Sequence, residues 1–236
     1  MRHAEQKGRC PLVLGIQGGP ASGKSTLAGL LAERGAGVID ADRIGHEILE
    51  RPHVKQALTQ AFGREILDRC GAVNRARLAE AAFADEQELR KLNDIVHPPL
   101  LEEIRRRVDG LKHDGNVGLI VLDAALLTEW NLDEELCDLL VFVDAPVAAR
   151  GQRAVASGRM SAEQFAKRSG AQLPDELKKG QADYVVNNAG SPAQLEQQAE
   201  KLWDVMQTGG LRARTQGARR GPEMDAPRGK TEGGET

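Results

Sequence analysis

Short apolar runs alternate with longer amphipathic segments along most of this chain. Leu12 to Ile16, Val117 to Asp123 and Leu139 to Asp144 are apolar without regular alternation, which is typical of parallel strands buried on both faces. Gly37 to Asp40 and Asp183 to Asn187 are shorter runs of the same kind. Because helical segments separate all of these runs, the pattern predicts a three-layer α/β domain with a five-stranded parallel sheet.

The segment between the second and third apolar runs, about residues 43–114, reads as helical throughout. Amphipathic helices are expected around Val54 to Phe62, Arg75 to Phe83 and Glu86 to Val96. The following His97-Pro98-Pro99 sequence is expected to break the helical pattern before another helix begins. A stretch of about 70 residues is longer than an ordinary crossover, so we expect an inserted substrate-binding subdomain.

A second helical segment, about residues 146–181, lies between the last two strands and is rich in Arg, Lys and Gln. Its position suits a lid that closes over phosphates, although an ordinary exposed helix pair would give the same pattern. Ser191 is expected to cap the final helix. The main domain is predicted at residues 12–208, after an N-terminal arm at 1–11. Residues 209–236 are rich in Gly, Arg, Pro and Thr, a composition typical of a disordered tail.

The stretch Gly18 to Thr26 (GGPASGKST) fits the phosphate-binding pattern G-x-x-x-x-G-K-[ST] between a strand and a helix. Its glycines let backbone N–H groups approach phosphate oxygens, and the following helix directs its positive end toward them. Lys24 can reach the β and γ phosphates, and the Ser25 hydroxyl is the expected protein ligand of Mg²⁺. A Gly-rich turn without a ligand is the alternative. The expected phosphate contacts are Gly19, Pro20, Ala21, Ser22, Gly23, Lys24, Ser25 and Thr26.

Carboxylates follow two of the predicted strands. Asp40 and Asp42 stand at the end of the second strand, and Asp123 ends the third. Ligands of open α/β sheets bind beyond the carboxyl ends of the strands, so all three lie in the right neighbourhood, with Asp123 where a carboxylate would support Mg²⁺. Either Asp40 or Asp42 could instead cap a helix that starts near Arg43.

Composition narrows the class of protein further. A net charge of −3 gives no electrostatic footprint for a nucleic-acid partner, and the Arg105 to Arg107 run is typical of a solvated face. Cys10, Cys70 and Cys137 lie far apart without a C-x-x-C pair, which favours reduced thiols in the cytoplasm. No apolar run approaches the roughly 18 residues of a membrane span, so we expect a soluble protein without a membrane partner.

The order and spacing of several motifs resemble those of the dephospho-CoA kinases from about Leu12 to Trp203. The resemblance implies a P-loop NTPase fold with a helical substrate-binding insertion and a helical lid. It further implies transfer of the γ-phosphoryl group of ATP, with Mg²⁺, to the ribose 3′-hydroxyl of dephospho-CoA. The matching motifs, besides the phosphate-binding loop, are Val38 to Asp42, Val73 to Phe83 with Arg75 and Leu78, Leu92-Asn93 with His97-Pro98, Leu126-Leu127 with Glu129, and Ala182 to Val186 with Asn188 and Gly190.

The resemblance also assigns roles to individual residues. It makes Asp42 the general base and Lys24 a catalytic cation, and leaves Asp40 a structural role. A monomer is favoured, although the sequence leaves the oligomeric state open. The remaining assignments are Gln17, Arg75 and His97 for the substrate, Asn188 for the adenine side, and Arg153, Arg159 and Lys178 for the lid.

Three departures from the family pattern lie near the predicted site. Gln17 stands where the family usually has Thr, which exchanges one hydrogen-bonding group for a longer one. Ala125 and Thr128 replace the usual Pro and Phe after the third strand. All three positions are therefore places where this chain is expected to differ from its relatives.

The predicted lid departs from the pattern as well. The family usually carries two arginines one helical turn apart, and here the first is Arg153 while Ser157 occupies the second position. Asp175 stands where some members have Arg, and a carboxylate close to the γ-phosphate would repel it. Arg159 or Arg168 could supply the missing positive charge.

Two other functions stay open on the sequence. One is a P-loop kinase for another small hydroxyl substrate such as a nucleoside, which the wording of the loop would suit. The other is an ATP-binding homologue with impaired transfer, which the lid departures motivate. The Arg75 to His97 pattern argues against the first, and the presence of Asp42 beside the loop argues against the second, because a protein that only binds nucleotide needs no base.

Overall fold

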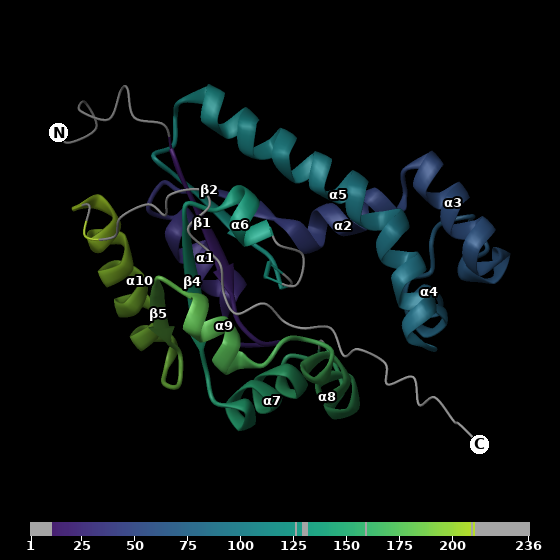
Figure 1. Cartoon of the computed structure of the whole chain (residues 1–236). Helices are drawn as coiled ribbons and strands as arrows, with labels where there is room; N and C mark the ends of the chain where they lie inside the picture. The colour runs from purple at the N-terminus through teal and green to yellow at the C-terminus, as the bar shows by residue number, and fades with distance from the viewer. Residues whose placement is uncertain (1–10, 126, 129–131, 159, 209, 211–236) are drawn as a thin grey trace, which may run out of the picture.

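A computed structural model describes residues 11–125, 127, 128, 132–158, 160–208 and 210, so the predicted arm and most of the predicted tail lie outside the described residues. The described strands form one parallel sheet in the order β2-β3-β1-β4-β5, which confirms the predicted α/β class (Figure 1). The strands are β1 (Leu12–Gln17), β2 (Gly37–Asp40), β3 (Leu119–Asp123), β4 (Leu139–Asp144) and β5 (Tyr184–Asn187).

Helices connect every pair of consecutive strands. Those between β2 and β3 include α3 and α4, which Figure 1 shows standing away from the sheet at one end of α5, while α7 and α8 lie on the opposite side of the molecule from α5. The described helices are α1 (Lys24–Ala32), α2 (Ala41–Leu49), α3 (Pro52–Phe62), the 3-10 helix η1 (Arg64–Ile66), α4 (Arg75–Ala82), α5 (Glu86–Asp114), α6 (Leu132–Leu136), α7 (Val147–Ala156), α8 (Ala162–Gly170), α9 (Asp175–Gln181) and α10 (Pro192–Gln207).

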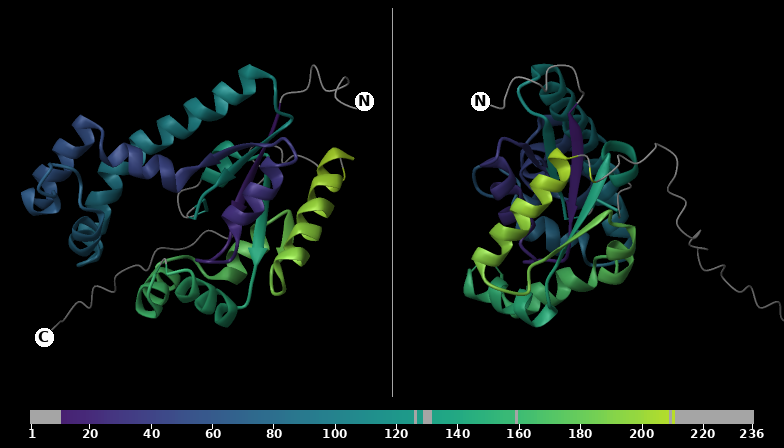
Figure 2. Two further views of the ribbon diagram at one scale, coloured as in Figure 1. Left: turned by 180° about the vertical axis from the view of Figure 1, so that it is seen from behind. Right: turned by 90° about the vertical axis from the view of Figure 1, so that its left-hand side faces the viewer.

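The sheet is buried on both faces, as the continuous apolar runs predict. Figure 2 shows helices on both sides of the sheet. Successive side chains of a strand point to opposite faces, so Val13 joins a core with residues of α2 and α5, whereas Leu14 joins a second core with α1 and α10. Both side chains are fully buried. This three-layer packing brings the ends of β1, β2 and β3 together, and the residues that follow these ends form the candidate site.

The predicted helix break at His97-Pro98-Pro99 is wrong, because α5 continues through both prolines. A proline inside a helix removes an N–H donor and crowds the preceding turn, at a cost of about 3 kcal/mol. Just beyond them Leu100, Ile104 and Val108 are at most 2% exposed and form a stripe that packs into the core. Each such side chain contributes about 1.5–3 kcal/mol of burial, so tertiary packing outweighs the local preference. None of the helices in the described ranges is long and apolar enough to span a membrane.

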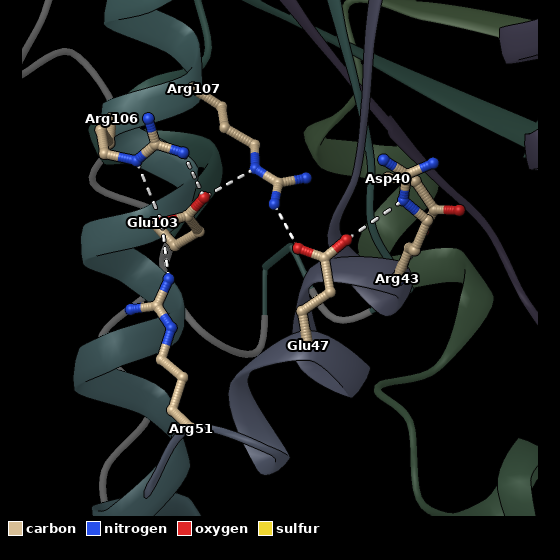
Figure 3. A network of polar contacts seen from close by, with 7 residues as sticks. All are labelled: Asp40, Arg43, Glu47, Arg51, Glu103, Arg106 and Arg107. Carbon is tan, nitrogen blue, oxygen red and sulfur yellow. Dashed lines mark hydrogen bonds and ion pairs between the residues drawn. The ribbon is translucent and has the colours of Figure 1, made fainter. Parts of the chain in front are cut away.

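A network of ion pairs joins α5 to α2 (Figure 3). The Glu103 carboxylate, 6% exposed, accepts hydrogen bonds from Arg51 at 2.6 Å, from Arg106 at 2.6 Å and from Arg107 at 2.8 Å. Arg107 also pairs with Glu47 on α2. The arginine run of α5 is therefore ion-paired, while Arg105 and Arg106 are exposed as expected from the sequence. Because α2 directly follows β2, the network fixes the helix that starts at the candidate site.

Replacing Glu103 with Gln is expected to lower the free energy of unfolding by about 2 kcal/mol at neutral pH, because hydrogen bonds to a buried charge are lost. The arginines, Arg106 first, hold the pKa of Glu103 well below its usual range. The stabilisation is therefore complete above the usual pKa of 4.5 and disappears as the pH falls through the lower pKa of the folded state. Urea unfolding of both proteins should give a difference that shrinks toward about pH 3.

Glu135→Gln is the matched control for this prediction. Glu135 pairs with Arg105, and both side chains are about half exposed, so its loss should cost less than about 1 kcal/mol. An equal loss of stability in the two variants, or a Glu103→Gln effect that does not change with pH, would contradict the role given to the buried carboxylate.

Candidate active site

The phosphate-binding loop joins β1 to α1 and is held by Asn188, which follows the edge strand β5. Gly23 has a φ of 102°, a left-handed conformation that favours glycine, and a Cβ there would overlap Asn188 Nδ2. The Asn188 amide, 6% exposed, donates to the Ser22 carbonyl at 2.7 Å. Gly23 therefore serves both the turn and the close approach of Asn188, a residue assigned from the sequence to the adenine side.

A partly exposed cation beside this loop interacts with two carboxylates. The Lys24 ammonium donates to the carbonyls of Gly18 at 2.9 Å and Gly19 at 3.1 Å. Burial lowers the pKa of Lys24, while the nearby charges of Asp123 and Asp42 act in the opposite direction. Desolvation likewise raises the pKa of both carboxyl groups, and Lys24 opposes that rise. The structure thus brings together residues that the sequence places far apart.

Asp40 and Asp42 have different surroundings. The Asp40 side chain caps α2 by accepting from the Arg43 backbone N–H at 2.9 Å, so it has the structural role proposed for it. Asp42 lies in the first turn of α2 and interacts with Lys24, with His46 one turn later and with Arg168 of α8. Asp42 is exposed to solvent, but its surroundings raise its pKa, chiefly by desolvation. An accessible carboxylate of raised pKa near a cation is suited to accept a proton.

Ser25 and Asp123 provide two further oxygen-bearing side chains near Lys24. The Ser25 hydroxyl hydrogen-bonds to the Asp123 carboxylate, which is 7% exposed at the end of β3. No group of three or more His, Cys, Asp and Glu side chains in the described ranges could hold a metal ion by itself. This pair still fits Mg²⁺, because in phosphoryl-transfer sites that ion takes few protein ligands and completes its shell with phosphate oxygens and water.

Gln17 and Thr128, two of the departures from the family pattern, are bonded to each other. Thr128 Oγ1 donates to Gln17 Oε1 at 2.7 Å, and Gln17 Nε2 donates to the Lys178 carbonyl at 2.9 Å. Gln17 is fully buried, so both ends of its amide are used inside the protein. Lys178, also fully buried, donates to Gln172 Oε1 at 3.2 Å. Gln17 therefore ties the end of β1 to α9, and its amide is directed at α9.

Arg153 and Ser157 of the predicted lid lie on α7 and at its end. The Arg153 guanidinium donates to the Asn188 carbonyl at 2.9 Å and to the Gly190 carbonyl at 3.3 Å, so it holds the β5–α10 loop. The Ser157 hydroxyl donates to the Ala154 carbonyl at 2.9 Å and closes the helix. Arg159 lies outside the described residues. Of the two residues expected to supply the charge missing at Ser157, the described one, Arg168, lies on α8 and interacts with Asp42.

Arg150 is the loop-facing residue that sequence reasoning missed. It is 3% exposed, and a Cβ on Gly19 would overlap its Nη1 atom. Its Nη2 atom pairs with Asp175, the first residue of α9. Asp175 was expected to repel a phosphate, but its charge is balanced by this arginine. The sequence signal that could have indicated this pair is the opposite charge of Arg150 and Asp175, which lie in the first turns of the lid helices α7 and α9.

The two remaining substrate candidates lie on the helical segment after β2. Arg75 Nη1 lies 2.6 Å from His46 Nε2, and His46 in turn interacts with Asp42. His97 lies within α5, where burial lowers its pKa and Glu135 acts in the opposite direction. Arg75 is thereby linked to the Asp42 side of the site, whereas His97 interacts with a residue of α6.

The phosphate-binding loop follows β1, the central strand of the sheet. On one side of β1 lie β3 and then β2, which end in the carboxylates Asp123 and Asp40. This sheet, its phosphate-binding loop and the basic helical segment before β5 define a P-loop kinase. The family model described as dephospho-CoA kinase matches residues 12–194. The chain belongs to the dephospho-CoA kinase family.

Individual relatives agree with the family match. The dephospho-CoA kinase of Corynebacterium diphtheriae is 39% identical over 197 residues, which cover 83% of this chain and 98% of the relative. That of Aquifex aeolicus is 38% identical over 194 residues, covering 82% and 96%. Among solved structures, that of TT1252 from Thermus thermophilus has a TM-score of 0.72 at 30% identity and covers 84% of this chain and 98% of its own. The likeness thus spans almost the full length of each relative.

Proposed function

We propose that this protein transfers the γ-phosphoryl group of ATP to the ribose 3′-hydroxyl of dephospho-CoA, giving coenzyme A and ADP. The observation that carries the proposal is the solvent-accessible carboxylate of Asp42, which interacts with Lys24 of the phosphate-binding loop. A nucleotide carrier would need the loop but no carboxylate beside it. Membership of the dephospho-CoA kinase family supports the choice of acceptor.

Asp42 acts as the general base in this mechanism. The transition state of phosphoryl transfer is loose, so the base mainly orients the attacking hydroxyl and accepts its proton as the bond to phosphorus forms. Desolvation raises the pKa of Asp42, which makes it a better proton acceptor than an ordinary aspartate. The charge of Lys24 opposes that rise.

Lys24 and the loop bind the transferring phosphates. The Lys24 ammonium already lies against the Gly18 and Gly19 carbonyls, from which it can turn to the β and γ phosphates without leaving the loop. Ser25 and Asp123 are the residues that would hold Mg²⁺, which when bound neutralises charge on the phosphate oxygens. We place the adenine near Asn188, whose side chain also holds the loop.

The helical segment from α2 to α5 is proposed to bind dephospho-CoA, with Arg75 and His97 as its candidate contacts. Lys167 of α8 lies 5.4 Å from the centre of the Phe83 ring at the end of α4, a cation–π contact. This contact joins the lid to the proposed substrate-binding helices. Closure of the lid and these helices around both substrates would exclude water from the transferring phosphoryl group.

The test is an assay of ADP release from Mg-ATP with dephospho-CoA, adenosine and uridine as separate acceptors, with the product confirmed by mass. Turnover is expected with dephospho-CoA and not with the two nucleosides. Asp42→Asn protein purified in the same way controls for contaminating kinases. Turnover with a nucleoside but not with dephospho-CoA would refute the acceptor, and ATP binding without turnover on any acceptor would refute the transfer.

A further inference from the structure

The Arg150 side chain occupies a place where a phosphate-binding group is useful. It starts in the first turn of α7, is almost completely buried, and reaches the backbone of Gly19 in the phosphate-binding loop. Gly19 leaves room for it, because any side chain at that position would overlap the guanidinium. An arginine thus lies directly against the loop that predicts phosphate binding in the sequence.

Three cationic side chains lie near one another beside this loop. Lys24, Lys178 and Arg150 lie close enough that the last two lower the pKa of the first. Lys24 faces Asp42 and Asp123, whereas Arg150 pairs with Asp175. Like charges that are brought together and buried raise the free energy of the site, and an anion among them lowers it. A nucleotide phosphate chain is the anion that this loop is built to hold.

The Arg150 guanidinium is also arranged to hold two anions at once. Asp175 accepts from Nη2, while Nη1 lies toward Gly19. The buried Nε atom makes no hydrogen bond to any residue that the structure describes. A planar guanidinium offers five N–H donors in a fixed fork, so one side can bind a carboxylate and the other a phosphate.

We infer that Arg150 binds the phosphates of the nucleotide, and that Asp175 is the positioning residue that orients it. The pair supplies the positive charge that Ser157 does not. The Asp175 carboxylate, about one-third exposed, fixes the guanidinium from the solvent side and leaves its loop-facing side for the ligand. The role in turnover rests on the proposed function, whereas the role in nucleotide binding does not.

A purely structural ion pair gives a different expectation from a phosphate-binding arginine. If Arg150 served only to balance Asp175, replacing both residues with neutral amides would restore stability and ATP affinity together. If Arg150 binds phosphate, the double replacement restores stability but leaves ATP affinity low, because the donor to the ligand is still missing.

The experiment compares Arg150→Gln, Asp175→Asn and the double variant with the unchanged protein. Tm, the Kd values of Mg-ATP and AMP, and kcat with dephospho-CoA are measured for each. Arg150→Gln and the double variant should weaken ATP binding by about tenfold or more, with AMP affected much less because it lacks the β and γ phosphates. Arg90→Gln is the control for Tm and for the two Kd values, since Arg90 forms an exposed pair with Glu86 and should change none of these three values.

Asp175→Asn should give an intermediate loss of ATP affinity, and Asp175→Glu should recover it, because an orienting carboxylate is retained. If Arg150→Gln fails to fold, the double variant carries the same test. ATP affinity at the level of the unchanged protein in the double variant would overturn the inference, as would equal losses for ATP and AMP. Failure of the proposed function would look different from these two outcomes. The unchanged protein would then show no turnover with dephospho-CoA, although it would still bind ATP and AMP with different affinities.

Discussion

Replacing Asp42 with Asn is expected to lower kcat by about 100-fold or more while leaving the Kd of ATP nearly unchanged. Asn keeps the size and shape of the side chain but cannot accept the proton of the attacking hydroxyl. Rapid-mixing or coupled assays give kcat, and calorimetric titration gives the Kd. The loop residues that bind the phosphates are untouched by this change, so nucleotide affinity serves as an internal check on folding.

Asp40→Asn is the matched control, since it is the same substitution two residues earlier on the other side of the helix start. Asp40 caps α2, and its amide variant should cost at most about 1 kcal/mol of stability without a large change in kcat. Desolvation raises the pKa of Asp42, so activity of the unchanged protein should fall with acid at a pH above the ordinary aspartate pKa of 3.8. Near-normal kcat in Asp42→Asn would remove Asp42 from the base role.

The sheet was predictable from sequence because its signals are local. Each strand is a short apolar run, and Ser191 caps α10 as expected, with its hydroxyl accepting from the Gln194 N–H. The continuity of α5 through Pro98 and Pro99 was not predictable in the same way. Local preference argues for a break there, and only the packing of the residues beyond it, which the sequence does not display, keeps α5 continuous.

The same division separates the parts of the site. Lys24 and Ser25 belong to one contiguous motif, so their role could be predicted from spacing alone. Arg150 was one of several basic residues in the lid segment, and which of them reaches the loop depends on the path of a long side chain. Asp175 was read by itself as a repulsive charge, although its effect depends on the arginine 25 residues earlier that pairs with it.

Gln17 and Thr128 illustrate a further limit. Each was recognised as a separate departure from the family pattern, at positions 111 residues apart in the chain. The structure joins them through a hydrogen bond, and Gln17 carries the link on to the backbone of Lys178. Two substitutions that look independent along a sequence can therefore be one local rearrangement, which only the fold reveals.

Lys24→Met is expected to lower kcat/KM by about 100-fold or more and to abolish the rise in Tm that ATP causes. Methionine retains much of the apolar length of the side chain but removes the cation that interacts with Asp42 and Asp123. Phosphates entering the loop would then meet these two carboxylates without its charge to offset them. Thermal unfolding with and without Mg-ATP measures the effect, since saturation at about 100 times the Kd stabilises the unchanged protein by about 2.7 kcal/mol.

Lys91→Met on α5 is the control for this change, because Lys91 is a partly exposed lysine paired with Glu88. It should retain the ATP-dependent rise in Tm and the kcat/KM of the unchanged protein. A normal ATP-dependent rise in Lys24→Met would mean that the loop backbone and Arg150 suffice for binding, which would assign Lys24 to the transition state alone. Normal turnover as well would remove Lys24 from the mechanism. Lys24 would then have only a structural role.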